Sequence, residues 1–271
     1  MILARWTGTR VLGGIALALL VVGGLVGLAT GVEHGQDGLD AAARAGLMVV
    51  PITLVWLAPL CCGAGAAMAM AQIMARGEHL GLEAAGLGPL RTGWVSAVAG
   101  LLVGTGAWWA SEVIVPQTTP VEAQSTWVWL DQGAYRASDG VLIRIESGRF
   151  LAVEQLSDPD PAMLRAAQQL AQPRTATHAV LRAADTPPAS VERHSRLARI
   201  LACGALALLG WVPLARRASA QVGIVLAVGL SAQALDLILQ ALAAQGKLPS
   251  TVGAWAIPLV LAGLAGLSVR R

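Results

Sequence analysis

A single acidic residue, Asp236, interrupts an apolar run that extends from Ala218 to Gly246. A carboxylate inside a membrane-spanning helix costs about 2.5–3.5 kcal/mol on insertion scales, so such a residue is treated as functional by default. Two interpretations stay open at this point. Asp236 either lines a substrate cavity or subunit interface, or it is an acid that is hydrogen-bonded to a neighbouring helix.

An intramembrane enzyme built on Asp236 has little support, because the positions one helical turn away supply no second acid, base or nucleophile. Those positions are Ala232, Gln233, Leu239 and Gln240. The pair Glu33-His34 offers a second acid and base, but its spacing matches no metal site. We therefore predict no catalytic residue and no metal in this chain.

The three cysteines, Cys61, Cys62 and Cys203, all lie inside apolar runs. They predict neither a disulfide framework nor a metal site. The chain also has no phosphate-binding pattern of the form G-x-x-x-x-G-K-[ST]. If ATP drives this protein, another polypeptide must bind it, so we expect no cofactor here.

Composition identifies lipid as the solvent of most of the chain. Of 271 residues, 55% are hydrophobic and only 13% are charged, whereas soluble domains carry about 25% charge. The formal net charge of +3 is too small and too scattered to indicate nucleic-acid binding.

Six apolar runs predict a membrane all-α fold with six transmembrane helices, three before and three after a polar insertion. The fifth run is interrupted only by Asp236. The fourth run is short and is expected to recruit Leu197 and Ala198, with Arg199 snorkelling to the interface. The runs are Val11–Thr30, Ala45–Ala75, Thr92–Ser111, Ile200–Ala215, Ala218–Gly246 and Leu248–Val269.

The polar insertion divides the chain into residues 1–115, 116–195 and 196–271, with helices in the outer two parts. Alternating residues predict strands at Ser125–Leu130, Val141–Ile145 and Arg149–Val153, the last two joined as a hairpin at Ser147-Gly148. A short helix at Pro161–Leu170 and a last strand at His178–Arg182 complete a small β-rich module.

Positive charge in the short loops predicts the orientation. With the N-terminus inside, eight arginines are cytoplasmic, and the short outside loops carry only Arg44 and Lys247. Both termini are then cytoplasmic and the insertion is outside. The eight are Arg5, Arg10, Arg76, Arg91, Arg216, Arg217, Arg270 and Arg271.

The cytoplasmic loop at residues 76–91, RGEHLGLEAAGLGPLR, is long enough for a short helix. Glu78 to Ala85 fits, with an acid in the first turn where the helix dipole favours it. Gly86 supplies a left-handed cap, and Pro89 starts the next helix. A short helix that lies across the membrane surface with a projecting acid suits docking of an ATPase subunit. A plain solvated loop is the alternative.

Four segments resemble the lipopolysaccharide-export permease family (LptF/LptG, also called YjgP/YjgQ). The most specific are the block with Glu78, Ala85 and Gly86 and the block Leu248-Pro249…Trp255…Pro258. The four, in order, are ILARWTGTRVLGG, the block from Val50-Pro51 through MARGEHLGLEAAGLGPLR, SEVIVPQTT, and GKLPSTVGAW with Pro258.

This resemblance implies a permease subunit of an ABC-type export complex in the bacterial inner membrane. Its partners would be a cytoplasmic ATPase dimer, a second permease subunit, the lipid cargo and a periplasmic bridge protein. The insertion would be a partial jellyroll, shorter than the family's usual periplasmic domain. The implied ATPase-coupling residues are Glu78, Leu82, Glu83, Ala85 and Gly86, and the implied lipid or gate contacts are Arg44 and Asp236.

On this reading Asp236→Leu impairs transport without abolishing membrane insertion. The short polar segment at residues 116–195 favours a second reading. In it the chain is a non-transporting membrane scaffold that presents its outer domain to a partner. An ATPase that co-purifies with the chain would distinguish the two.

Overall fold

A computed structural model describes most of the membrane portion of the chain and parts of the insertion. The described residues are 2–33, 39–86, 89–115, 127–130, 133–136, 141–146, 149–155, 176, 181–182, 187–215 and 217–269. The predicted helix at Pro161–Leu170 lies outside them.

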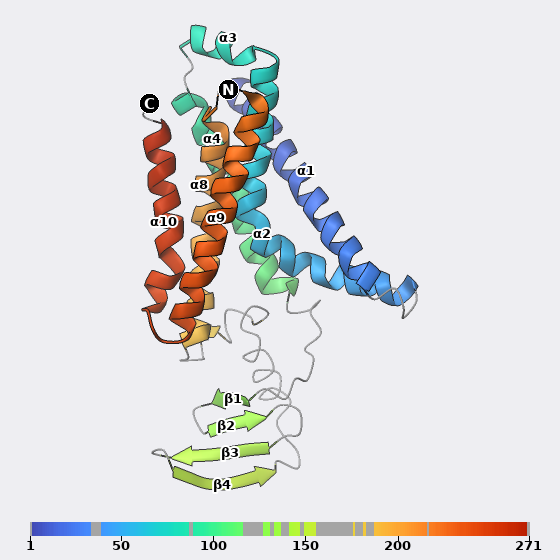
Figure 1. Ribbon diagram of the computed structural model, residues 1–271, viewed down its shortest axis with the longest axis vertical. Coiled ribbons are helices and arrows are strands. Elements are labelled where there is room, and N and C mark those ends of the chain that lie inside the picture. Colours follow the sequence, from blue (N-terminus) through green and yellow to red (C-terminus); the bar gives the residue numbers. More distant parts are fainter. Residues whose placement is uncertain are drawn as a thin grey trace.

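Six long helices form the bundle in the described part, and one short helix, α3, lies at one end of it (Figure 1). Both chain termini lie at the α3 end, and the strands lie at the opposite end (Figure 1). The helices are α1 (Ile2–Glu33), α2 (Leu39–Ala75), α3 (Glu78–Ala84), α4 (Pro89–Val113), α8 (Pro187–Trp211), α9 (Ala218–Ala244) and α10 (Ser250–Val269).

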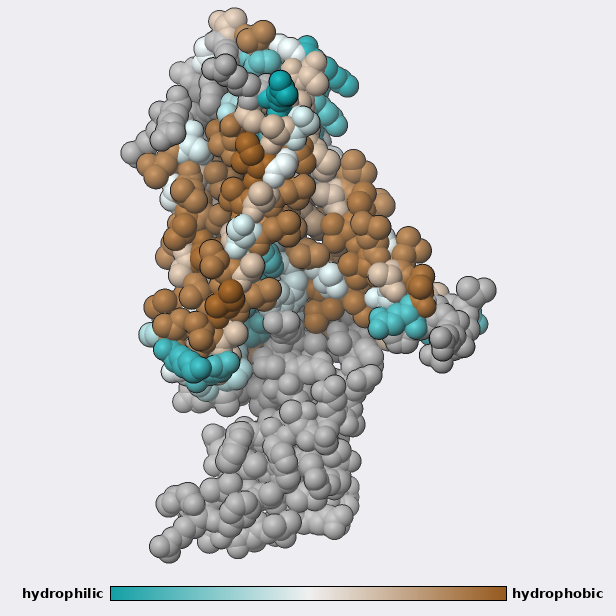
Figure 2. Space-filling model, in the orientation of Figure 1, coloured by the Kyte–Doolittle hydropathy of each residue, from teal (hydrophilic) through white to brown (hydrophobic). Residues whose placement is uncertain are grey.

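Five of the long helices are long and apolar enough to cross a membrane. They contain the spans Arg5–Glu33, Ala43–Ala75, Thr92–Val113, Ala218–Ala244 and Ser250–Ser268. Figure 2 shows the corresponding surface: apolar residues cover the face of the bundle between two polar ends. The chain is thus a multi-pass membrane protein.

Helix α8 differs from the other five because its first half is charged. It begins at Pro187, thirteen residues before the predicted apolar run at Ile200 and inside the segment assigned to the insertion. The helix packs against α2, α4, α9 and α10, and three of its charged residues, Glu192, Arg196 and Arg199, pair within the bundle. The expectation that Arg199 snorkels to the interface is wrong: the residue is 9% exposed.

Glycines let the helices approach at backbone contact. A Cβ built on Gly14 of α1 would lie 2.3 Å from the carbonyl oxygen of Gly65 in α2. One built on Gly210 of α8 would lie 2.3 Å from the carbonyl oxygen of Gly63. Between α4 and α8, the Trp211 indole N–H donates to Thr92 Oγ1 at 2.8 Å.

Helix α2 continues through Pro51 and Pro59. Its first part runs at an angle to the rest (Figure 1), and proline is the usual cause of such a bend. Helix α1 lies along α2 in close backbone contact. A Cβ on Gly46 of α2 would clash with the Gly27 carbonyl oxygen of α1. The outer half of α1 presents exposed apolar residues, among them Leu20 at 73% and Leu28 at 69%.

The described strands form one antiparallel sheet in the order β1-β2-β3-β4. The predicted hairpin strands coincide with β3 and β4, which pair with Ile143 opposite Val153. The strand β2 was not predicted. The expected last strand at His178–Arg182 is wrong at its end, because residues 181 and 182 are helical. The strands are β1 (Trp127–Leu130), β2 (Gly133–Arg136), β3 (Val141–Glu146) and β4 (Arg149–Gln155).

Candidate functional site

The predicted short helix in the loop at residues 76–91 is present as α3. Two glycines with positive φ bracket it, Gly77 at +69° and Gly86 at +68°. Residues with side chains rarely adopt this conformation, so glycine allows the chain to leave α2 and α3 abruptly. Pro89 opens α4 as expected. The local sequence therefore places α3 across the end of the bundle.

Glu78 faces the bundle and does not project from it. Its carboxylate accepts from Arg10 of α1 at 3.0 Å, and Arg76, the residue that follows α2, lies 3.8 Å from its other oxygen. The Arg10 guanidinium also stacks 4.4 Å above the Trp6 ring. The expectation of a projecting acid is therefore wrong, because two arginines at the same membrane face attract it. Glu78 joins α1, α2 and α3.

The other predicted coupling residues differ in their surroundings. Leu82 is partly buried against the main apolar core, so it anchors α3 to the bundle. Ala85 and Gly86 are exposed at the end of α3, beside a strongly exposed Leu80 at 61%. Glu83 lies in α3, and its side chain is outside the described part. Among the described side chains, the exposed residues at α3 are thus small or apolar.

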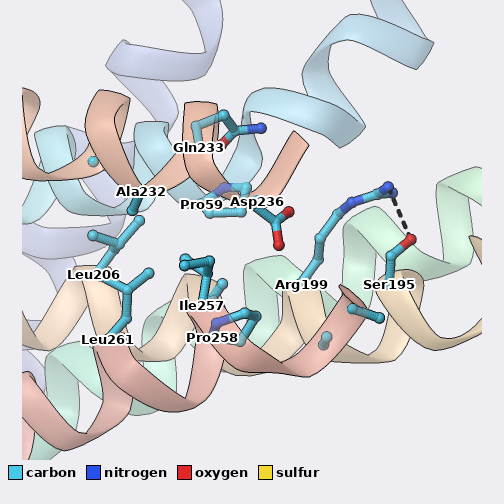
Figure 3. Close-up of a pocket in the computed structure, with 14 residues that line it drawn as sticks. Pro59, Ser195, Arg199, Leu206, Ala232, Gln233, Asp236, Ile257, Pro258 and Leu261 are labelled. Atoms are coloured by element: carbon cyan, nitrogen blue, oxygen red, sulfur yellow. Dashed lines mark hydrogen bonds between the residues drawn. The ribbon is translucent and has the colours of Figure 1, made fainter. Parts of the chain in front are cut away.

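Asp236 lines a pocket between α2, α8, α9 and α10. Its carboxylate points from α9 into the pocket (Figure 3). One oxygen, Oδ2, accepts from Gln240 Nε2 at 2.6 Å. The other oxygen, Oδ1, is buried and has no hydrogen-bond partner in the described part of the chain.

Arg199 lines the same pocket from α8. It donates to Ser195 Oγ at 3.3 Å, lies 3.6 Å from Glu192, and stacks 4.1 Å above the Trp56 ring of α2. Figure 3 shows the Ser195 contact and the Asp236 carboxylate beside it. No direct ion pair joins Arg199 to Asp236 among the described residues.

Arg196 connects this pocket to the root of the insertion. Its side chain is 1% exposed and pairs with Glu112 of α4 at 2.8 Å and with Glu192 at 3.1 Å. It also donates to the Ala176 carbonyl oxygen at 2.7 Å. The Arg196 guanidinium therefore joins α4, which leads to the insertion, α8, which leads back from it, and Ala176, which precedes α8.

The charged face of α8 was missed because the helix was expected to begin too late. Residues 192, 196 and 199 follow an i, i+4, i+7 spacing that places them on one helical face. Had the helix been extended toward Pro187, this spacing would have indicated a charged face turned inward. Arg10 was counted only for orientation, and no local pattern links it to Glu78.

The structure does not bring all the predicted site residues together. The α3 group and Asp236 lie on separate elements, and Arg44 is exposed near the start of α2, away from the residues that line the Asp236 pocket. The cysteines are free and buried. In the described ranges, no three His, Cys, Asp or Glu side chains are grouped to hold a metal.

Comparison with known proteins finds a family that is similar to the last part of the chain. Residues 166–271 match the family model described as lipopolysaccharide export system permease LptF/LptG. This match includes α8, α9 and α10, and hence Asp236 and Arg199. No curated protein matches the chain. The resemblance found in the sequence is confirmed over residues 166–271, where the chain is similar to the LptF/LptG permease family.

Proposed function

We propose that this chain is a permease subunit of an ABC-type complex that extracts lipopolysaccharide from the bacterial inner membrane toward the periplasm. The family match over residues 166–271 carries the proposal. A separate cytoplasmic ATPase dimer supplies the energy, and a second permease subunit completes the pathway. The chain itself performs no chemistry.

The topology in this proposal has six membrane spans, with α8 as the fourth. Only about its last twelve residues are apolar, but its charged residues are paired inside the bundle and so need not face lipid. The positive loops place both termini and α3 in the cytoplasm. The β-rich insertion is then periplasmic, where it receives the lipid and meets a bridge protein.

The coupling role of α3 is supported by its contacts with three elements. An ATPase that pushes on α3 acts on α1 through Arg10 and on α2 through Arg76. Leu82 adds an apolar contact with the core. Helix α1, with its exposed apolar outer half, is then the element that moves against a partner subunit or the lipid.

The test is co-purification of a tagged full chain from native membranes in mild detergent. The unaltered chain is expected to bring down an ATPase, and Glu78→Ala is expected to weaken that association. The control is Glu33→Ala, an exposed acid at the other end of α1, which should change nothing.

Arg10→Ala separates two roles of Glu78. If Glu78 contacts the ATPase directly, Arg10→Ala retains the ATPase. If Glu78 acts by holding α3 against α1, both variants lose it to a similar degree. Absence of any ATPase from the unaltered preparation would refute the proposal, and retention of a periplasmic partner in that preparation would support the scaffold reading instead.

A further inference from the structure

The Asp236 pocket has features of a ligand site that the transport role does not use. Its walls are apolar toward α10 and α8, with Ile257, Pro258, Leu206 and Leu261 (Figure 3). Its polar groups gather at one side, where Asp236 and Arg199 lie. An apolar pocket with a few convergent polar groups is the usual form of a small-molecule site.

The mouth of the pocket is on the α9 side. Most lining residues are buried, whereas the partly exposed ones, Ala232, Gln233, Asp236 and Ile257, belong to α9 and α10. The neighbouring residues Leu235 and Leu259 are 52% and 57% exposed. Because these helices are membrane spans, the pocket opens toward lipid.

The depth of Asp236 suits a lipid headgroup. It lies eight residues before the end of α9 at Ala244, which is about 12 Å at 1.5 Å per residue. A bilayer of about 40–45 Å has a hydrocarbon core of about 30 Å, which leaves some 5–7 Å of headgroup on each side. If Ala244 lies at the outer edge of the headgroup layer, Asp236 is about 5–7 Å below that layer, at the end of the bundle opposite α3.

The ion pairs beside the pocket do not include Asp236. Arg196 pairs with Glu112 and Glu192, and Arg199 pairs with Glu192. Among the described residues, the Asp236 carboxylate therefore has no ion-pair partner. Its Oδ1 atom is buried and has no partner in the described part of the chain. A buried oxygen of this kind requires a hydrogen-bond donor.

We propose that this pocket binds the headgroup of an aminophospholipid, with the primary ammonium of phosphatidylethanolamine donating to Asp236 Oδ1. Arg199 lines the same pocket and repels a simple cation, but the ammonium of this lipid carries a phosphate two carbons away, which Arg199 attracts. Phosphatidylcholine has the same phosphate and no N–H donor. Phosphatidylglycerol has no cation. The apolar walls accept the start of the acyl chains.

The experiment is native mass spectrometry of the detergent-purified full chain with three lipids of identical acyl chains: phosphatidylethanolamine, phosphatidylcholine and phosphatidylglycerol. A charge-assisted hydrogen bond corresponds to about tenfold or more in affinity. The unaltered chain is therefore expected to bind phosphatidylethanolamine at least about tenfold more tightly than the other two. No ATPase is needed, so the result is independent of the co-purification test.

Asp236→Asn keeps the shape of the side chain and removes its charge, and it is expected to reduce phosphatidylethanolamine binding to the level of phosphatidylcholine. Asp40→Asn, an exposed acid in the first turn of α2, is the matched control and should retain the preference. Equal binding of phosphatidylethanolamine and phosphatidylcholine by the unaltered chain overturns the proposal, whether or not the variant folds. A preference that survives Asp236→Asn also overturns it.

Discussion

Arg196→Met is the most informative perturbation of the bundle. The side chain of Arg196 is 1% exposed, and it has partners at 2.8 Å on Glu112, 3.1 Å on Glu192 and 2.7 Å on the Ala176 carbonyl. Methionine has a similar length and fills much of the space. The substitution thus removes the charge and the hydrogen bonds while leaving the packing nearly intact.

The expected loss follows from what the substitution leaves behind. Glu112 and Glu192 are 17% and 7% exposed at their side chains, so water replaces the lost guanidinium poorly. Breaking a buried ion pair from one side costs about 3–5 kcal/mol. At about 2–4 °C per kcal/mol for a chain of this size class, the melting temperature should fall by roughly 6–20 °C.

The assay is thermal unfolding of the purified chain in detergent, followed by the fluorescence of its nine tryptophans. Arg193→Met is the matched control, because Arg193 is on the same helix and partly exposed; its melting temperature should change by a few degrees at most. Adding Glu112→Gln and Glu192→Gln to Arg196→Met removes the unpaired charges and should recover part of the loss. If Arg196→Met and Arg193→Met melt together, the buried cluster does not stabilise the bundle and the reasoning is refuted.

Two further substitutions test the packing of the helices. Gly65→Val should destabilise the chain by about 1–3 kcal/mol or more, because a Cβ at this position would clash with the Ile15 backbone nitrogen. The control is Gly13→Val, which should be nearly neutral in the same thermal assay, because a Cβ there would have nothing within 4 Å. Similar losses for both would contradict the close contact of α1 and α2. Gln221→Leu should cost about 3 kcal/mol, because this fully buried side chain accepts from Leu214 and Ala215 and donates to the Gly210 and Val212 carbonyls. The control, Gln233→Leu, removes the hydrogen bond to the Trp56 carbonyl and should cost about 1 kcal/mol. Equal losses of stability in the two variants would show that the turn between α8 and α9 does not depend on Gln221.

Much of the membrane portion can be read from local sequence. The runs of apolar residues predict six spanning helices, and five of them are helices long and apolar enough to cross a membrane, because the bilayer accepts little else of that length. The glycines and proline around residues 77–89 predict α3 and its ends, because these residue types restrict the backbone wherever they occur. Family resemblance was also readable from such segments, and residues 166–271 confirm it.

Local sequence does not predict the structure where a charged residue is neutralised by a residue far away in the chain. Hydropathy alone places the start of α8 at about Ile200, because Glu192, Arg196 and Arg199 look unfit for a bundle interior. They are buried because Arg196 meets Glu112, which is 84 residues away in the chain. No window of sequence contains that pair.

Asp236 and Glu78 show the same division. Their types and positions mark them as unusual from the sequence, because an acid in a span or at a helix start has a local physical meaning. Their partners are a matter of packing: Arg10 lies 68 residues from Glu78, and Arg199 reaches the Asp236 pocket from another helix. Local chemistry thus determined which residues matter, and the meeting of distant helices decided what each of them contacts.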